Sequence, residues 1–216
     1  MSRFFKAARP DADSLKFMTT TTDAGRLIQP VLQDLAEIIA NIRPEQFPDP
    51  TPCTEFDVAT LRAHVLGWVT YFGAALNDPE GSTERPDPKI AVAPDDPKAA
   101  ADIVRAAATK IAKAVDDGVA ERSVLMIKSS MPGDSLLRMA LWEYLTHGND
   151  LASASGQPWD PPVAAAENAL EFGPMMLTDE YRGAGKDFGV IVTVPDDAPA
   201  LDRLIGFSGR DPRWKP

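Results

Sequence analysis

The fold of this chain is limited above all by a set of long segments in which apolar residues recur every three or four positions. Five such residues lie on one helical face of the first segment: Leu27, Val31, Leu35, Ile38 and Ile42. Comparable segments cover 57–77, 97–118 and 131–156, and proline, glycine or aspartate bounds each of them. The pattern predicts a mainly α fold with four long helices.

The connections between these segments also fit a helical bundle. The stretch 80–97 is polar and rich in proline, which is typical of a long crossover on the surface of a bundle. Pro30 stands inside the first segment, so we expect either a kink or a helix that starts late. Asp95 and Asp96 precede Pro97, a sequence that favours a helix start with proline in its first turn.

The two ends of the chain differ from the middle. Residues 1–17 mix basic and aromatic residues without a clear period, which indicates an N-terminal arm. We assign 18–180 to the bundle and 181–216 to a C-terminal extension that packs on it. Further helices are expected at 162–173 and 199–207, and the run 188–194 is the only strand-like segment.

Charge and composition exclude several classes of partner. The chain has 22 Lys and Arg against 32 Asp and Glu, a formal net charge of −10, so phosphate backbones and anionic membranes would repel it. No apolar run approaches a membrane span, and the first residues lack the apolar core of a secretory signal. The single cysteine, Cys53, rules out an internal disulfide and fits a reducing compartment. We therefore expect a cytoplasmic protein that binds neither nucleic acid nor membranes.

Histidine occurs only twice, at His64 and His147. Glu143 and His147 stand four residues apart, so on a helix they share one face and can converge on one ion. Glu143 lies in an apolar stripe, where an unpaired carboxylate is costly and calls for a proton, a cation or a metal. The alternatives are a satisfied core histidine at 64 and an ordinary helical Glu–His contact. Asp150 is either a hydrogen-bond acceptor for a ligating imidazole or a solvated helix residue.

Other chemical motifs are weak or missing. Cys53 is a candidate nucleophile, but no histidine or lysine neighbours it in sequence, which favours a packing role. The glycine-rich nucleotide loops, the serine-hydrolase elbow and the paired CxxC motifs of zinc ribbons do not occur.

Three blocks of sequence resemble one family. They are Thr51-Pro-Cys-Thr-Glu-Phe through His64 to Gly67, Glu143-Tyr-Leu-Thr-His147 to Gln157, and the tail from Val194 to Gly209-Arg-Asp-Pro212. Together they are similar to actinobacterial metal-binding proteins related to mycothiol-dependent maleylpyruvate isomerase, in the DinB-like superfamily. The resemblance covers about residues 20–212. It departs at Phe56, where the family often has tryptophan, and it does not include the full extra C-terminal domain of the isomerase.

The resemblance implies a four-helix bundle that holds a divalent metal through His64, Glu143 and His147. Two imidazoles and a carboxylate suit zinc with an open position, and nickel, iron or manganese could use the same ligands. The family implies mycothiol as co-substrate, held by the metal as a thiolate for attack on an electrophilic substrate, which gives a thiol-dependent isomerase or transferase. Two alternatives stay open: a hydrolase that uses metal-bound water, and a non-catalytic binder. The sequence also leaves open whether the chain is a monomer or a homodimer.

Overall fold

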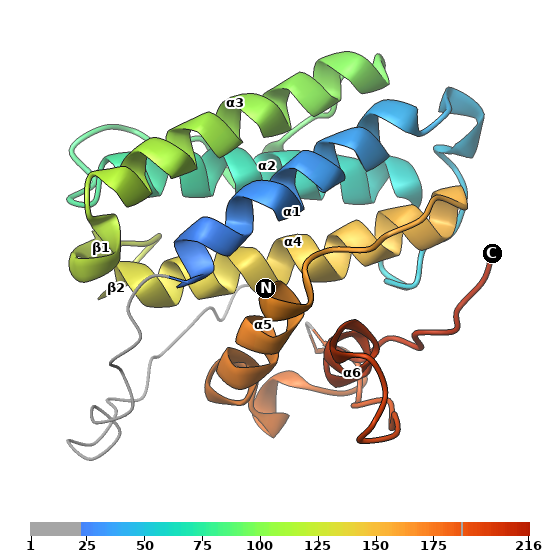
Figure 1. Ribbon diagram of the computed structural model, residues 1–216. Helices are drawn as coiled ribbons and strands as arrows, with labels where there is room; N and C mark the ends of the chain where they lie inside the picture. The colour runs from blue at the N-terminus through green and yellow to red at the C-terminus, as the bar shows by residue number, and fades with distance from the viewer. Residues whose placement is uncertain (1–22, 187) are drawn as a thin grey trace.

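The computed structural model describes residues 23–186 and 188–216, and six α-helices dominate this part of the chain (Figure 1). Four of them form a bundle: α1 (Asp23–Asn41), α2 (Val58–Asn77), α3 (Pro97–Asp116) and α4 (Gly133–Ser155). Both α1 and α2 pack against α3 and α4. The predicted mainly α fold is confirmed, whereas the N-terminal arm expected at 1–17 lies outside the described residues.

The helix ends follow local chemistry. The Asp57 side chain accepts a hydrogen bond from the Thr60 backbone N–H at 2.8 Å and so caps α2. Asp96 caps α3 in the same way, directly before Pro97. Gly156 ends α4 in the left-handed conformation at φ +70°. Helix α1 begins at Asp23 and continues through Pro30. Of the two alternatives for this proline, the late start is therefore wrong, and the kink stays a prediction.

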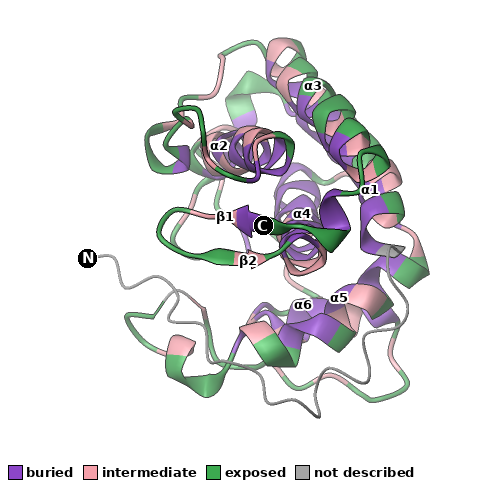
Figure 2. Ribbon diagram, turned by 90° about the vertical axis from the view of Figure 1, so that its left-hand side faces the viewer, coloured by how far each residue is buried: buried purple, intermediate pink, exposed green. Residues whose placement is uncertain are grey.

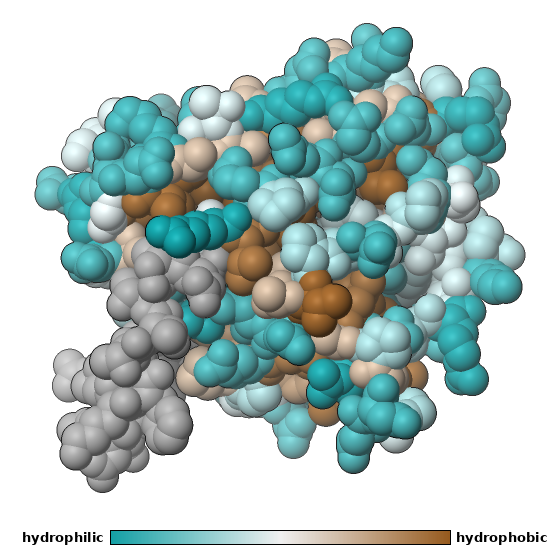
Figure 3. Space-filling view, in the orientation of Figure 1, coloured by the Kyte–Doolittle hydropathy of each residue, from teal (hydrophilic) through white to brown (hydrophobic). Residues whose placement is uncertain are grey.

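The buried sides of the four helices meet in one apolar core (Figure 2). Its largest fully buried aliphatic side chains come from α1, α2, α3 and α4: Ile28, Leu32, Leu35, Ile39, Leu61, Leu76, Ile111, Leu136 and Leu137. Hydrophilic side chains cover most of the face formed by α1 and α3, with smaller hydrophobic areas between them (Figure 3). None of the helices in the described ranges is long and apolar enough to cross a membrane.

The small sheet lies elsewhere than the sequence indicated. Strands β1 (Ser123–Leu125) and β2 (Ser130–Pro132) pair antiparallel between α3 and α4, with Val124 opposite Met131. The run 188–194 forms no strand, so the expectation of a strand there is wrong. A strand needs a neighbour for its backbone, and this run has only one isolated bridge, from Arg182 to Phe188, and one backbone bond, from Val192 N to Gly206 O.

The C-terminal helices pack beneath α4 (Figure 1). Helix α5 (Val163–Met176) lies against α4, and α6 (Ala200–Phe207) lies mainly against α5. Trp142 of α4 donates its indole N–H to Ser208 Oγ at 2.8 Å and stacks on Phe188 with 5.8 Å between ring centroids. These contacts fasten the C-terminal segment to the bundle, and the boundary we placed between 180 and 181 stays a prediction.

Candidate metal centre

Helix α2 carries the first histidine at the edge of its buried face. Leu61 and Val65 are buried in the core, while His64 and Trp68 are half-buried. Phe56, in the loop before α2, packs beside the His64 ring at 5.0 Å between centroids. The capped start of α2 and this aromatic contact fix the place from which His64 points toward α4.

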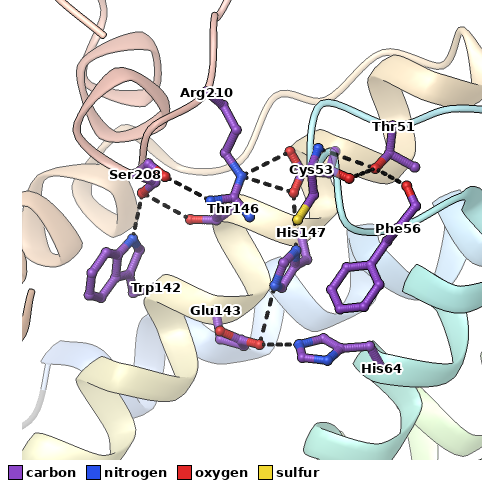
Figure 4. Close-up of polar contacts among 11 residues, drawn as sticks. Thr51, Cys53, Phe56, His64, Trp142, Glu143, Thr146, His147, Ser208 and Arg210 are labelled. Atoms are coloured by element: carbon purple, nitrogen blue, oxygen red, sulfur yellow. Dashed lines mark hydrogen bonds and ion pairs between the residues drawn. The ribbon is translucent and has the colours of Figure 1, made fainter. Parts of the chain in front are cut away.

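Helix α4 supplies Glu143 and His147, one turn apart and facing α2 (Figure 4). His64 Nε2 lies 2.9 Å from Glu143 Oε1, and His147 Nε2 lies 3.3 Å from the same oxygen. The three candidate ligand atoms all lie within 4.8 Å of one another. The structure therefore brings together the three candidate ligands, although His64 and Glu143 stand 79 positions apart in the chain.

The exposed fraction of the Glu143 side chain differs from what the sequence led us to expect. The Glu143 side chain, expected to be buried in an apolar stripe, is 26% exposed, and His64 is 25% exposed. The His147 side chain is only 8% exposed. Because Glu143 and His64 sit at the open edge between α2 and α4 whereas His147 is enclosed, the cluster is covered on one side and reachable from solvent on the other.

Asp150 is fully buried and lies one turn beyond His147. Its Oδ2 lies 3.0 Å from His147 Nδ1. The solvated alternative for Asp150 is therefore wrong, and the geometry is that of an acceptor for the Nδ1–H of an imidazole whose Nε2 stays free. Whether that imidazole ligates a metal stays a prediction.

The charges of the cluster depend on one another. The partial loss of water around the Glu143 carboxyl would by itself raise its pKa, but His147 and His64 outweigh this effect and hold that pKa well below its usual range. Burial would lower the pKa of His147, but Glu143 and Asp150 together raise it to about 9. The metal-free cluster thus favours a charged Glu143 beside a protonated His147, and a cation could take the place of that proton.

The donor set and its spacing fit a divalent ion. Two imidazole nitrogens and one carboxylate oxygen are a ligand set of catalytic zinc sites with an open position. Ligand atoms around a tetrahedral zinc with bonds of ~2.1 Å lie about 3.4 Å apart. The distances of 2.9 and 3.3 Å to Glu143 Oε1 are close to that spacing, so small side-chain shifts would admit an ion.

Two further residues lie beside the cluster, and the sequence did not single out the first of them. Arg210, 7% exposed, donates from Nε to Asp150 Oδ2 at 3.1 Å (Figure 4). Arg210 stands in the tail Gly209-Arg-Asp-Pro212. The likeness of this tail to the family was the only feature of the sequence that could have pointed to Arg210. Cys53 lies nearby, and burial raises the pKa of its thiol while Arg210 lowers it and Asp150 raises it further. A raised pKa disfavours the thiolate, which supports the packing role for Cys53.

The cavity between α2, the crossover and α3 is a separate feature. It has a volume of about 320 Å³ and is lined by residues such as Leu66, Thr70 and Ile90. Leu66 follows His64 by two positions and so points to the other side of α2. None of the three candidate ligands lines this cavity.

Comparisons with known proteins show which family this chain belongs to. Residues 28–152, more than half of the chain, match the family described as the mycothiol maleylpyruvate isomerase N-terminal domain. Two uncharacterized proteins of Mycobacterium tuberculosis, Rv0738 and MT0763, are each 30% identical over 178 residues, which are 82% of this chain and 92% of theirs.

A solved structure agrees at the level of the fold. The crystal structure of the mycothiol-dependent maleylpyruvate isomerase matches with a TM-score of 0.54, covering 77% of this chain and 72% of that one. Its sequence identity is 14%, so this likeness shows a shared fold alone. The expected DinB-like helical fold is confirmed, and the chain belongs to the family of the mycothiol maleylpyruvate isomerase N-terminal domain.

Proposed function

We propose that this protein binds a divalent metal ion, zinc first among the candidates, and catalyses a reaction of isomerase or transferase type that depends on a small thiol such as mycothiol. The observation that carries the proposal is the convergence of His64 Nε2, Glu143 Oε1 and His147 Nε2 between α2 and α4. Membership of the family supports mycothiol as the thiol. The partners are then this thiol and a small electrophilic substrate.

Each side chain has a defined part in holding the ion. His64 and His147 offer neutral nitrogens, and Glu143 offers the only negative charge, so a divalent ion would keep one positive charge in excess. Asp150 accepts the Nδ1–H of His147 and keeps Nε2 free for the ion. When bound, such an ion would supply the Lewis acidity that keeps a thiol deprotonated near neutral pH.

The exposed edge of the cluster gives a thiol and a substrate their route of approach. His64 and Glu143 are each about a quarter exposed, and aromatic rings flank His64. The centroids of Phe56 and Trp68 lie 5.0 and 6.3 Å from that of His64. These rings would pack against apolar parts of a bound molecule while its thiol or electrophilic group reaches the ligands.

The first test is metal content. We expect about one divalent ion per chain in protein purified without a histidine tag, and loss of most of it in His64→Ala, because two ligands rarely hold zinc. Glu171→Gln is the matched control, since Glu171 is exposed on α5 and touches none of the three ligands. Elemental analysis measures both variants. Full metal content in His64→Ala would refute the ligand set.

The second test is thiol-dependent turnover. The metal-loaded protein is incubated with mycothiol and epoxides, chloronitroarenes or cis-dienoic acids, beside Glu143→Gln and His147→Ala. Turnover that needs the thiol and is lost in both variants supports the proposal. Turnover without thiol would instead indicate a hydrolase. No turnover, together with no thiol binding by calorimetry, would leave a non-catalytic metal binder.

A further inference from the structure

One buried ion pair connects the C-terminal segment to the candidate metal centre. Arg210 Nε donates to Asp150 Oδ2 at 3.1 Å and to Oδ1 at 3.3 Å, and Asp150 Oδ2 also lies 3.0 Å from His147 Nδ1. We propose that Arg210 is a positioning residue: through Asp150 it fixes the orientation and the free Nε2 of His147, and thereby sets the metal affinity. This inference rests on the proposed function, in which His147 is a ligand.

The structure holds Arg210 in place from several sides. Its backbone N–H donates to Ile205 O at 3.1 Å, and its Nη1 donates to Ser208 O at 2.7 Å. Gly209 allows the sharp turn before it, with φ +82° and a backbone so close to Gly189 that a Cβ would lie 2.8 Å from the Gly189 carbonyl oxygen. The turn at Gly209 and these hydrogen bonds therefore hold the Arg210 guanidinium in one position beside Asp150. It is not a flexible side chain on the surface.

Asp150 needs this cation because it has no exposure to water. A fully buried carboxylate is costly unless charged and hydrogen-bonding partners surround it. Among the described contacts of its side chain, the partners are His147 and Arg210. Without Arg210, Asp150 would gain by turning toward solvent, and it would leave the His147 ring without the acceptor that orients it.

Arginine suits this place better than lysine. One planar guanidinium donates to Asp150 from Nε and to the Ser208 carbonyl from Nη1 at the same time. A lysine ammonium keeps the charge but is a compact group without that fixed fork. Arg210→Lys should therefore retain part of the positioning effect, whereas Arg210→Met keeps most of the packing volume and loses all of the effect.

If Arg210 only fastened the C-terminal segment to the rest of the protein, its loss would have the same effect as the loss of another arginine that stabilises this segment. Arg182 is such an arginine: its Nη1 donates to Phe207 O at 2.7 Å, and its guanidinium lies 4.5 Å from the centre of the Phe207 ring. It fastens the end of α6 without contacting Asp150. Arg182→Met is thus the matched control for loss of an arginine from this region.

The first readout is zinc affinity, measured by competition with a chelator and paired with circular dichroism of each metal-free variant. Loss of a group that supports a ligating histidine lowers metal affinity by about 10–100-fold, so we expect this for Arg210→Met. Arg210→Lys should fall between it and the wild type, and Arg182→Met should stay within about twofold. A folded Arg210→Met with wild-type affinity would overturn the inference. If Arg210→Met does not fold, an unchanged affinity in Arg210→Lys would do the same.

The second readout needs no metal. In the metal-free protein, the Nδ1–H of His147 should give a protected imidazole N–H signal by nuclear magnetic resonance, because it faces a buried acceptor. We expect this signal in the wild type and in Arg182→Met, and its loss in Arg210→Met. Should the wild type bind no zinc, the proposed function fails, and this signal alone then decides the inference: its persistence in Arg210→Met refutes the positioning role.

Discussion

The interface between α1 and α3 and the interface between α2 and α4 belong to one bundle but are built from different side chains. The face of α3 toward the core is rich in alanine, and Gly25 of α1 sits directly against Val115 of α3. Between α2 and α4, imidazoles, aromatic rings and a carboxylate take that place. Contact between the backbones is most extensive for α1 and α3 and much smaller for α2 and α4.

The difference shows how one bundle can combine a stable core with a polar site. Small side chains let two helices approach closely, which leaves no room for a ligand. Between α2 and α4, aromatic rings such as Phe72 and Tyr144 take the place of alanine, and the donor atoms meet at an edge that solvent can reach. Stability and metal binding should therefore respond to substitutions in different interfaces.

The largest expected effect on stability comes from the closely packed side. Ile111 of α3 is fully buried, so Ile111→Ala should lower the free energy of unfolding by about 2–5 kcal/mol through lost burial and a residual cavity. The metal content of the folded fraction should not change. Chemical denaturation and elemental analysis measure the two quantities, with the exposed Thr109→Ala on the same helix as control. A loss of metal that accompanies the loss of stability would mean that the two interfaces are coupled.

The division between the two interfaces also explains what the sequence could predict. The helices were readable because apolar spacing, the caps at Asp57 and Asp96 and the stop at Gly156 act locally. Glu143 and His147 could be paired because one helix carries both. Bringing His64 to them depended on the family likeness, since no local rule places α2 beside α4.

The errors lie where tertiary contacts decide. The run 188–194 is apolar and β-branched, but its neighbours are helices, and so it has no strand to pair with. Glu143 was expected to be buried because its neighbours in sequence are apolar, yet it lies at the open edge of the bundle. Arg210 went unrecognised because a charged residue in a tail gives no sign of being buried against Asp150, 60 positions away.

Removing the proposed metal ion should have a smaller effect on stability, confined to the α2–α4 side. Binding to the native state alone contributes about 2.7 kcal/mol when free metal is at a hundredfold excess over Kd. Chelation should therefore lower the melting temperature by about 5–10 °C. Chelation should not lower the free energy of unfolding further by leaving Glu143 unpaired, because the imidazoles of His64 and His147 still contact its carboxylate. His64→Ala should show no shift on chelation, and an unchanged wild-type melting curve after confirmed metal removal would contradict metal-linked stability.

The smallest expected effect tests whether the two sides of α2 are independent. Gly73 lies inside α2 and faces α3, where an added Cβ would lie 3.7 Å from Ala107, an ordinary van der Waals contact. Gly73→Ala should raise the free energy of unfolding by about 0.5–1 kcal/mol, because alanine loses less conformational freedom in a helix than glycine does.

Gly67 provides the contrast on the same helix. Its Cβ would lie 2.3 Å from the Pro88 carbonyl oxygen, so Gly67→Ala must displace the crossover and should destabilise the protein. Zinc affinity in Gly73→Ala should equal that of the wild type, because the change lies on the side of α2 that contacts α3. A stabilised Gly73→Ala with altered zinc affinity would show that α2 transmits packing changes from its α3 side to His64, and the separation between the two interfaces would then fail at this helix.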